Sequence, residues 1–280
     1  MAGKDLKKPI GPIKPAQPGL HIVTKTTEAK APSLVPRWGA GVSQSKPASK
    51  AATPPKSVGT AANAGLSSER ARARMVERIA RQGIRHQTVL DAMRQVPRHA
   101  FVDEALASRA YEDSALPIGH QQTISQPYVV ARAIELALEL SGREGQGPIK
   151  AFELGGGCGY QAAVMSLCFA QVVSVERVKA LADLARLNLR PLRRSNLRFI
   201  YGDGFAVAAA EGPFDVILCS AGMPTVPKEL LQQLTIGGVM VAPIGEPEQF
   251  LMGIQRVAET EFKSQAFDMV RYVPVIRGTE

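Results

Sequence analysis

The sequence predicts an α/β protein with a Rossmann-like, doubly wound and mostly parallel sheet, N-terminal helices, an antiparallel edge hairpin and a disordered N-terminal tail. Three observations predict this fold. The composition changes near residue 66, short apolar runs alternate with helical segments from residue 149 onward, and a glycine-rich turn follows the first of these runs. Alternation of this kind is typical of parallel strands that are connected by right-handed helical crossovers.

Residues 1–66 form the predicted tail. They hold nine of the 20 prolines, and ten Lys and Arg residues against two acidic ones, so they carry +8 of the net charge of +9. Such a segment cannot bury enough apolar surface to offset the entropy lost on ordering. We expect a disordered basic tail over 1–66 and one folded domain over 67–280. The tail can tether nucleic acid by its charge, but a solvated extension without a partner is the favoured interpretation.

The remaining composition narrows the class of protein. The three cysteines, Cys158, Cys168 and Cys219, do not have the spacing of metal ligands, and neither a secretion signal nor an apolar run of membrane-spanning length is present. We therefore expect a cytoplasmic protein with reduced thiols, without a metal site and without a membrane partner.

The folded domain is predicted to open with helices. Ser67 or Ser68, directly before Glu69, is a candidate helix N-cap. Apolar residues then recur at helical spacing, with a break at Gly83 and an end at Pro97.

The sheet is predicted from short apolar runs at 149–154, 172–176, 197–201, 214–219 and 238–243. Helices are expected between them at 160–169, 178–189 and 227–234. Two longer alternating stretches, 249–257 and 262–275, follow with a short connection, which predicts an antiparallel hairpin on the sheet edge.

The glycine-rich turn is the strongest local signal. Residues 151–160 read A-F-E-L-G-G-G-C-G-Y, ending a predicted strand and opening a helix. Glycines let the backbone turn sharply and approach a ligand closely, and the helix N-terminus offers unpaired N–H groups. In an open parallel sheet, ligands bind in the crevice at this edge.

Two ligand classes compete for this turn. The spacing Gly157-x-Gly159-x-x-Ala162 fits the dinucleotide pattern loosely. The rival pattern, E-x-G-x-G-x-G, is filled by Glu153, Gly155, Gly157 and Gly159. A carboxylate so near the turn favours S-adenosylmethionine, which carries an ammonium and a sulfonium and no phosphate. A dinucleotide would place negative charges there at a cost of about 1 kcal/mol or more per close pair.

Two further acidic residues follow the next strands. Glu176 ends the second predicted strand, where an acid can accept both hydroxyls of a ribose. Asp203, followed by Gly204, ends the third and can accept from an adenine amine. The alternative for each acid is a helix N-cap at the end of a strand. Three acids in three successive loops favour the ligand interpretation.

The sequence resembles the protein-L-isoaspartate O-methyltransferase family over about residues 70 to 278. The resemblance rests on G-H-Q-Q-T-I-S-Q-P at 119–127, the glycine-rich turn, S-V-E-R at 174–177, G-D-G at 202–204 and R-Y-V-P-V at 271–275. The Q-T-I-S-Q-P segment is its specific part, since the glycine-rich turn would fit most methyltransferases.

The resemblance implies a class I methyltransferase fold and a protein-repair reaction. S-Adenosylmethionine would donate a methyl group to the free carboxylate of L-isoaspartyl residues in damaged proteins or peptides, and the enzyme would act as a monomer. The family's active-site serine falls on Ser125, and its contacts to substrate backbone include 273–275. The predicted cofactor contacts are Gln122, Thr123, Ile124, Glu153, Gly155, Gly157, Gly159, Glu176, Asp203 and Gly204.

This chemistry needs no strong base, because a carboxyl group is already ionised at neutral pH. Alignment of the reacting atoms and exclusion of water should help most. Ser125 can orient the carboxylate by donating a hydrogen bond. Thr123 can do the same on the residues alone, and the resemblance selects Ser125.

The sequence departs from the family at Gly156 and Cys158, where Thr and Ser are usual. An extra glycine costs about 0.5–1 kcal/mol in backbone entropy, and two hydroxyls are lost. One alternative is therefore a methyltransferase of the same fold with a different acceptor. Another is a non-catalytic binding module whose basic tail docks nucleic acid, and a nicotinamide-dependent oxidoreductase comes last.

Overall fold

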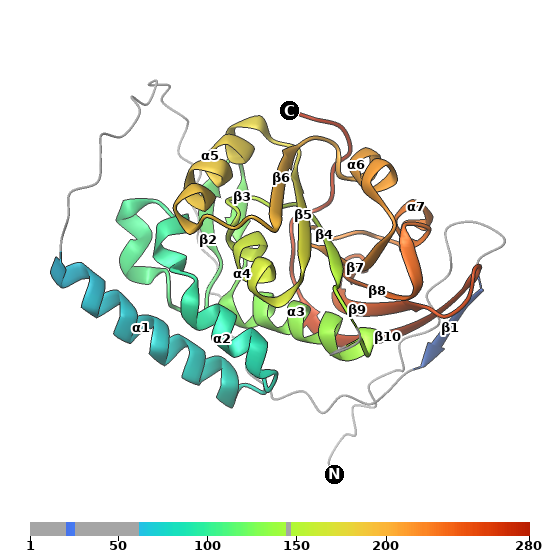
Figure 1. Cartoon of the computed structure of the whole chain (residues 1–280), viewed down its shortest axis with the longest axis horizontal. Coiled ribbons are helices and arrows are strands. Elements are labelled where there is room, and N and C mark those ends of the chain that lie inside the picture. The colour runs from blue at the N-terminus through green and yellow to red at the C-terminus, as the bar shows by residue number, and fades with distance from the viewer. Residues whose placement is uncertain (1–20, 26–61, 144–146) are drawn as a thin grey trace, which may run out of the picture.

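The computed structural model describes residues 21–25, 62–143 and 147–280 (Figure 1). Most of the predicted tail, 1–20 and 26–61, lies outside the described residues, so its disorder stays a prediction. None of the helices in the described ranges combines the length and the apolar character that crossing a bilayer requires.

A single eight-stranded sheet organises the molecule, in the order β1-β10-β9-β8-β7-β4-β5-β6. Strands β4 to β8 are mutually parallel, β9 is antiparallel to both β8 and β10, and β1 joins the edge parallel to β10. The strands are β1 His21–Lys25, β4 Lys150–Leu154, β5 Gln171–Glu176, β6 Leu197–Tyr201, β7 Phe214–Cys219, β8 Leu234–Ile244, β9 Gln249–Arg256 and β10 Glu261–Val270. The predicted doubly wound sheet and its antiparallel hairpin are confirmed.

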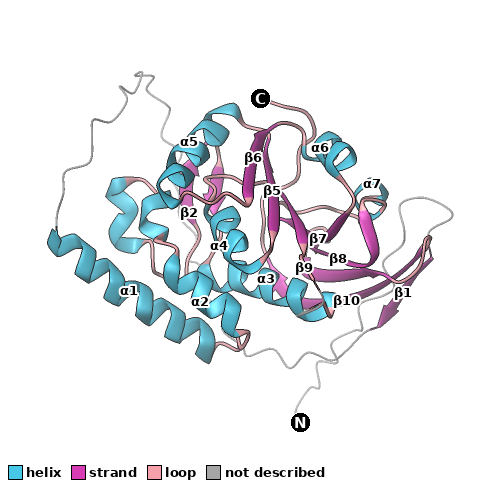
Figure 2. Cartoon of the chain, viewed as in Figure 1, coloured by secondary structure: helices cyan, strands magenta, loops and turns pink. Residues whose placement is uncertain are grey.

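Helices cover both faces of this sheet (Figures 1 and 2). They are α1 Ala62–Arg81, α2 Gln87–Gln95, α3 Pro127–Ser141, α4 Tyr160–Cys168, α5 Lys179–Leu189, α6 Gly204–Glu211 and α7 Lys228–Leu231. Short 3-10 turns lie at Arg98–Phe101, Glu104–Arg109 and Arg190–Leu192. A separate two-stranded hairpin, β2 Leu116–Gly119 and β3 Gln122–Ile124, precedes α3.

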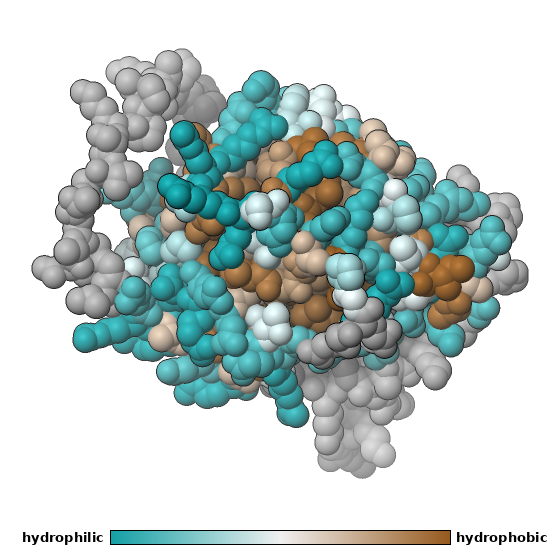
Figure 3. All heavy atoms as spheres, viewed as in Figure 1, coloured by the Kyte–Doolittle hydropathy of each residue, from teal (hydrophilic) through white to brown (hydrophobic). Residues whose placement is uncertain are grey.

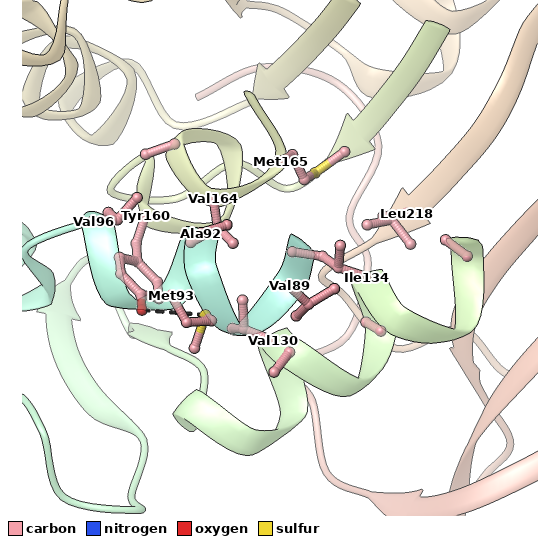
Figure 4. Close-up of a cluster of buried hydrophobic side chains, with 14 of the residues drawn as sticks. Val89, Ala92, Met93, Val96, Val130, Ile134, Tyr160, Val164, Met165 and Leu218 are labelled. Atoms are coloured by element: carbon pink, nitrogen blue, oxygen red, sulfur yellow. Dashed lines mark hydrogen bonds between the residues drawn. The ribbon is translucent and has the colours of Figure 1, made fainter. Parts of the chain in front are cut away.

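Successive side chains of a strand point to opposite faces of the sheet, so the protein has one hydrophobic core on each face. In β7, Val216 and Leu218 pack with α1 to α4, whereas Ile217 and Cys219 face α6 and α7. Figure 4 shows the first core, in which side chains of α2, α3 and α4 meet, among them Val89. On the face seen in Figure 3, hydrophilic side chains surround hydrophobic ones that gather toward the middle.

The structure extends the predicted elements at the N-terminal side. Helix α1 begins at Ala62, so Ser67 and Ser68 lie inside it and do not cap it. Alanine is the strongest helix former, which lets the helix continue upstream of the serines. The sequence predicted no element at 21–25, where the structure has β1, and Ile22, Val23 and Thr24 have the β-branched side chains that strands favour.

Several other bounds differ. The predicted helix at 227–234 is shorter, because β8 already begins at Leu234, and β10 ends at Val270 and not at 275. Helix α6 and the β2–β3 hairpin were not predicted. Helix α3 was also missed, although Pro127 stands at its first turn and Gly142 ends it in the left-handed conformation, both typical terminal signals.

Candidate active site

The glycine-rich turn links β4 to α4 at the carboxyl edge of the parallel strands. Gly155, Gly157 and Gly159 have φ of +87°, +54° and +88°, a region that side-chain-bearing residues rarely adopt. The N–H groups of Gly155 and Gly156 both donate to the Val175 carbonyl, at 2.9 and 3.0 Å. The turn is therefore tied to β5 and leaves a backbone surface without side chains.

Gly156 is required for a different reason. A Cβ there would lie 2.5 Å from Ser174 Oγ and 2.7 Å from Phe199 Cε2, closer than real contacts allow. Neighbouring side chains thus occupy the space that the family's usual threonine would need. Cys158 is 2% exposed, and burial raises the pKa of its thiol to about 11. It therefore stays protonated at neutral pH, as expected of a small buried side chain and not of a nucleophile.

Glu153 lies in the core beneath the turn. It is fully buried, and its Oε2 accepts a hydrogen bond from Ser174 Oγ at 2.5 Å, while its Oε1 has no partner among the described residues. Burial raises the pKa of Glu153 to about 8; the Ser174 bond opposes that rise and the nearby Glu176 adds to it. Burial disfavours the charged form of this carboxyl group, and the contact with a cationic ligand that the sequence predicts for Glu153 stays a prediction.

Glu176 joins the end of β5 to the turn. Its Oε2 accepts from the N–H of Gly157 at 2.9 Å, and its Oε1 accepts from the N–H of Val178 at 2.8 Å. The side chain is 5% exposed. Each carboxylate oxygen can accept a second hydrogen bond, so these contacts leave capacity for ligand hydroxyls.

Asp203 caps helix α6. Its Oδ1 accepts from the N–H of Phe205 at 2.8 Å, and its Oδ2 accepts from the N–H of Gly278 in the C-terminal segment. Partial burial opposes ionisation, but these N–H groups lower the pKa of Asp203. The N-cap interpretation that the sequence left open is therefore observed. The following Gly204 is closed to a side chain, since a Cβ would meet Leu154 Cγ at 2.9 Å.

Ser125 directly follows the β2–β3 hairpin. Ile118 of β2 reaches within 3.3 Å of the Cβ position of Gly157, so the hairpin packs on the glycine-rich turn. At the hairpin turn His120 and Gln121 have φ of +50° and +57°. Of the predicted contacts that precede Ser125, Gln122 is partly exposed, Thr123 is exposed and Ile124 is buried.

The C-terminal segment, which includes Tyr272 and 273–275, passes beside Ser125. Its Val273 carbonyl accepts from the N–H of Gly222 at 2.7 Å, which anchors 273–275 next to the end of β7. Gln249 holds the backbone of Tyr272 through its side-chain amide, at 2.7 and 3.3 Å. Burial raises the pKa of the Tyr272 phenol, and a contact with Ser125 partly offsets this.

The structure brings most of the predicted residues to one edge of the sheet. The turn, Glu176, Asp203 and the Ser125 loop meet there, whereas Glu153 lies beneath them. Sequence reasoning missed Arg98 and Tyr272 as part of this site. Arg98 donates to the Ser125 carbonyl at 2.7 Å, and the Tyr272 hydroxyl contacts Ser125. Tyr272 lies in the R-Y-V-P-V segment that carries the family resemblance, but neither residue type signals by itself which loop it will contact.

A doubly wound sheet with a glycine-rich turn at the first crossover and acids after the next two strands defines a class I methyltransferase fold. The family model described as protein-L-isoaspartate(D-aspartate) O-methyltransferase matches residues 70–280. A protein-L-isoaspartate O-methyltransferase of Burkholderia thailandensis is 48% identical over 264 residues, covering 91% of this chain and 77% of the relative. One of Burkholderia pseudomallei (strain K96243) is 46% identical over 277 residues, covering 96% and 83%.

Solved structures share the fold. A Plasmodium falciparum chain named as a protein-L-isoaspartate O-methyltransferase, in complex with S-adenosyl-L-homocysteine, superposes with a TM-score of 0.64 at 24% identity, covering 72% of this chain and 97% of that one. A second protein-L-isoaspartate O-methyltransferase gives 0.62 at 26% identity, covering 73% and 65%. The chain belongs to the protein-L-isoaspartate O-methyltransferase family.

Proposed function

We propose that the protein transfers a methyl group from S-adenosylmethionine to the free carboxylate of L-isoaspartyl residues in damaged proteins or peptides. Family membership over residues 70–280 carries this proposal. The packing of the Ser125 hairpin on the glycine-rich turn supports it, because donor and acceptor sites must adjoin for direct transfer.

The described residues fit this cofactor. Gly155 and Gly157 present backbone without side chains, as a closely approaching ligand requires. The two remaining acids of the site, Glu176 and Asp203, would hold the ribose hydroxyls and the adenine amine, and the Gln122–Ile124 strand would close over the ligand. When bound, the cofactor supplies a methyl group on an electrophilic sulfonium. Glu153 would support the turn from below.

The protein's own task is to orient the acceptor and to exclude water. The isoaspartyl carboxylate is ionised at neutral pH, so no residue has to remove a proton from it. Ser125 would donate a hydrogen bond to one carboxylate oxygen and so direct the other toward the methyl group. The backbone of 273–275, anchored beside the same loop, would hold the peptide on either side of the damaged residue.

The organisation of the chain is part of the proposal. We infer a tail at 1–66 and a methyltransferase domain at 67–280 that acts as a cytoplasmic monomer on isoaspartyl proteins. The family match beginning at residue 70 supports this boundary. Nucleic-acid contact through the basic tail is the less favoured option.

Methylation of matched peptides tests the proposal. Labelled methyl groups should pass from S-adenosylmethionine to an isoaspartyl peptide and not to the aspartyl peptide of the same sequence. Ser125→Ala should lower kcat while cofactor affinity, measured by calorimetry, stays unchanged. Equal labelling of both peptides would contradict the repair function, and an unchanged kcat in the variant would remove Ser125 from catalysis.

A further inference from the structure

Arg98 is a charged side chain in the interior that the proposed chemistry does not use. It lies in the 3-10 turn Arg98–Phe101, ahead of the Ser125 hairpin, and is 0% exposed. Its Nε donates to the carbonyl of Ala110 at 2.8 Å, and its Nη2 donates to the carbonyl of Ser125 at 2.7 Å. The guanidinium also lies over the ring of Tyr160, 4.8 Å from the ring centre.

These contacts join the two halves of the site. Ser125 stands on the acceptor side, while Tyr160 is the first residue of α4 and directly follows the glycine-rich turn on the cofactor side. Tyr160 is itself 1% exposed and packs edge-on against Phe101, with 5.4 Å between ring centres. One rigid, buried guanidinium group thus touches the serine loop and the start of the cofactor helix together.

Burying the charge of Arg98 in the interior is unfavourable in free energy. Within the described ranges no salt bridge involves Arg98. Its Nη1 has no hydrogen-bond partner there either. A buried charge without an ionic partner loses its hydration, and no attraction to an opposite charge offsets that loss. Packing alone therefore does not account for an arginine here.

We propose that Arg98 is a positioning residue, which fixes the Ser125 loop relative to the glycine-rich turn and so sets the alignment of the acceptor with the methyl donor. The inference rests on the proposed function of Ser125. Its physical basis is that direct transfer depends steeply on the geometry of the reacting atoms, and a displacement of about 1 Å can cost about 100-fold in rate. A guanidinium group suits this task because its N–H groups point in fixed directions.

Replacing Arg98 by methionine separates positioning from folding. Methionine keeps much of the volume and avoids the burial of a charge, but it leaves the carbonyls of Ala110 and Ser125 without their donor. Arg98→Met should therefore still fold, with a moderately lower melting temperature. In the same protein kcat on the isoaspartyl peptide should fall by about 10- to 100-fold with a small change in KM. Amide hydrogen exchange of the cofactor-free protein should be faster at 122–127 and unchanged at β6.

Arg256 provides a matched control at the opposite edge of the sheet. It also donates to backbone carbonyls, those of Leu234 at 2.6 Å and Glu259 at 2.8 Å, and also lies over an aromatic ring, that of Phe262 at 5.9 Å. Arg256→Met should leave kcat and exchange at 122–127 unchanged.

Each outcome decides the proposal. A folded Arg98→Met protein with wild-type kcat and wild-type exchange at 122–127 would overturn it. If that variant does not fold, Arg98→Lys, which keeps the charge but can donate along fewer directions, must show reduced kcat, and full activity would overturn the proposal equally. If the wild-type protein does not methylate isoaspartyl peptide, the proposed function fails, while the exchange measurement still tests whether Arg98 holds the serine loop.

Discussion

Substituting Gly156 by alanine would test how tightly the glycine-rich turn is packed. The added methyl carbon would lie 2.5 Å from Ser174 Oγ and 2.7 Å from two ring carbons of Phe199. Ser174 cannot turn away freely, because its hydroxyl donates to the buried carboxyl of Glu153 at 2.5 Å. Overpacking of this kind costs about 1–3 kcal/mol. For a domain of this size we expect the melting temperature to fall by roughly 2 to 12 °C.

A double-mutant cycle connects this loss to one neighbour. Phe199→Leu removes the two ring carbons that crowd the new methyl group, so Gly156→Ala should cost less in that background by about 0.5 kcal/mol or more. Thermal and urea denaturation of the four proteins, followed by circular dichroism, measures the coupling. Calorimetry with S-adenosylmethionine should show weaker binding by Gly156→Ala, since the turn must shift.

Two results would refute this reasoning. The first is a Gly156→Ala protein as stable as the wild type, which would mean that the turn has room for a side chain. The second is strict additivity of the two substitutions, which would mean that Phe199 is not the obstacle. The Phe199→Leu single variant supplies the baseline for both comparisons.

Three further predictions concern the groups around the site. Burial raises the pKa of Glu153 to about 8 in the folded protein, so the protonated carboxyl favours the folded state fully below its ordinary pKa near 4.5, and this contribution is lost as pH rises toward 8. Glu153→Gln should therefore flatten the decline of the unfolding free energy with pH, measured by urea denaturation. Parallel curves of unfolding free energy against pH for the two proteins would contradict this. Tyr272→Phe should lower kcat about 2- to 10-fold at unchanged melting temperature, because the contact between its hydroxyl and Ser125 is lost. Tyr201→Phe should leave kcat unchanged, since the Tyr201 hydroxyl contacts an oxygen of the C-terminal residue Glu280 at 3.5 Å. Deleting 278–280 removes the Gly278 N–H from Asp203 and should tighten S-adenosylmethionine binding about 2- to 10-fold by calorimetry; equal or weaker binding would show that the segment does not compete with the cofactor.

Local patterns in the sequence predicted most of the fold. The strands Leu197–Tyr201 and Phe214–Cys219 have the predicted bounds, because each is a short apolar run between polar turns. The left-handed glycines of the turn were likewise predictable from their spacing. Helix α3 was not predicted, because ten of its 15 residues are buried and its polar face is a narrow one, formed by Arg132, Glu135 and Glu139. Strand β1 was missed because its pairing partner, β10, is more than 200 residues away.

The sequence by itself determined which chemical groups are candidates for the site: the glycines, the two acids at the ends of β5 and β6, and Ser125. Tertiary structure decided their states and their surroundings. The pKa of Glu153 is raised because the core around it excludes water, and Gly156 has no room for a side chain because Phe199, from a strand more than 40 residues later, fills the space beside it. Burial sets the pKa of a side chain, and contact with distant segments sets the space around a glycine. Neither can be predicted from the residues that are adjacent in the sequence.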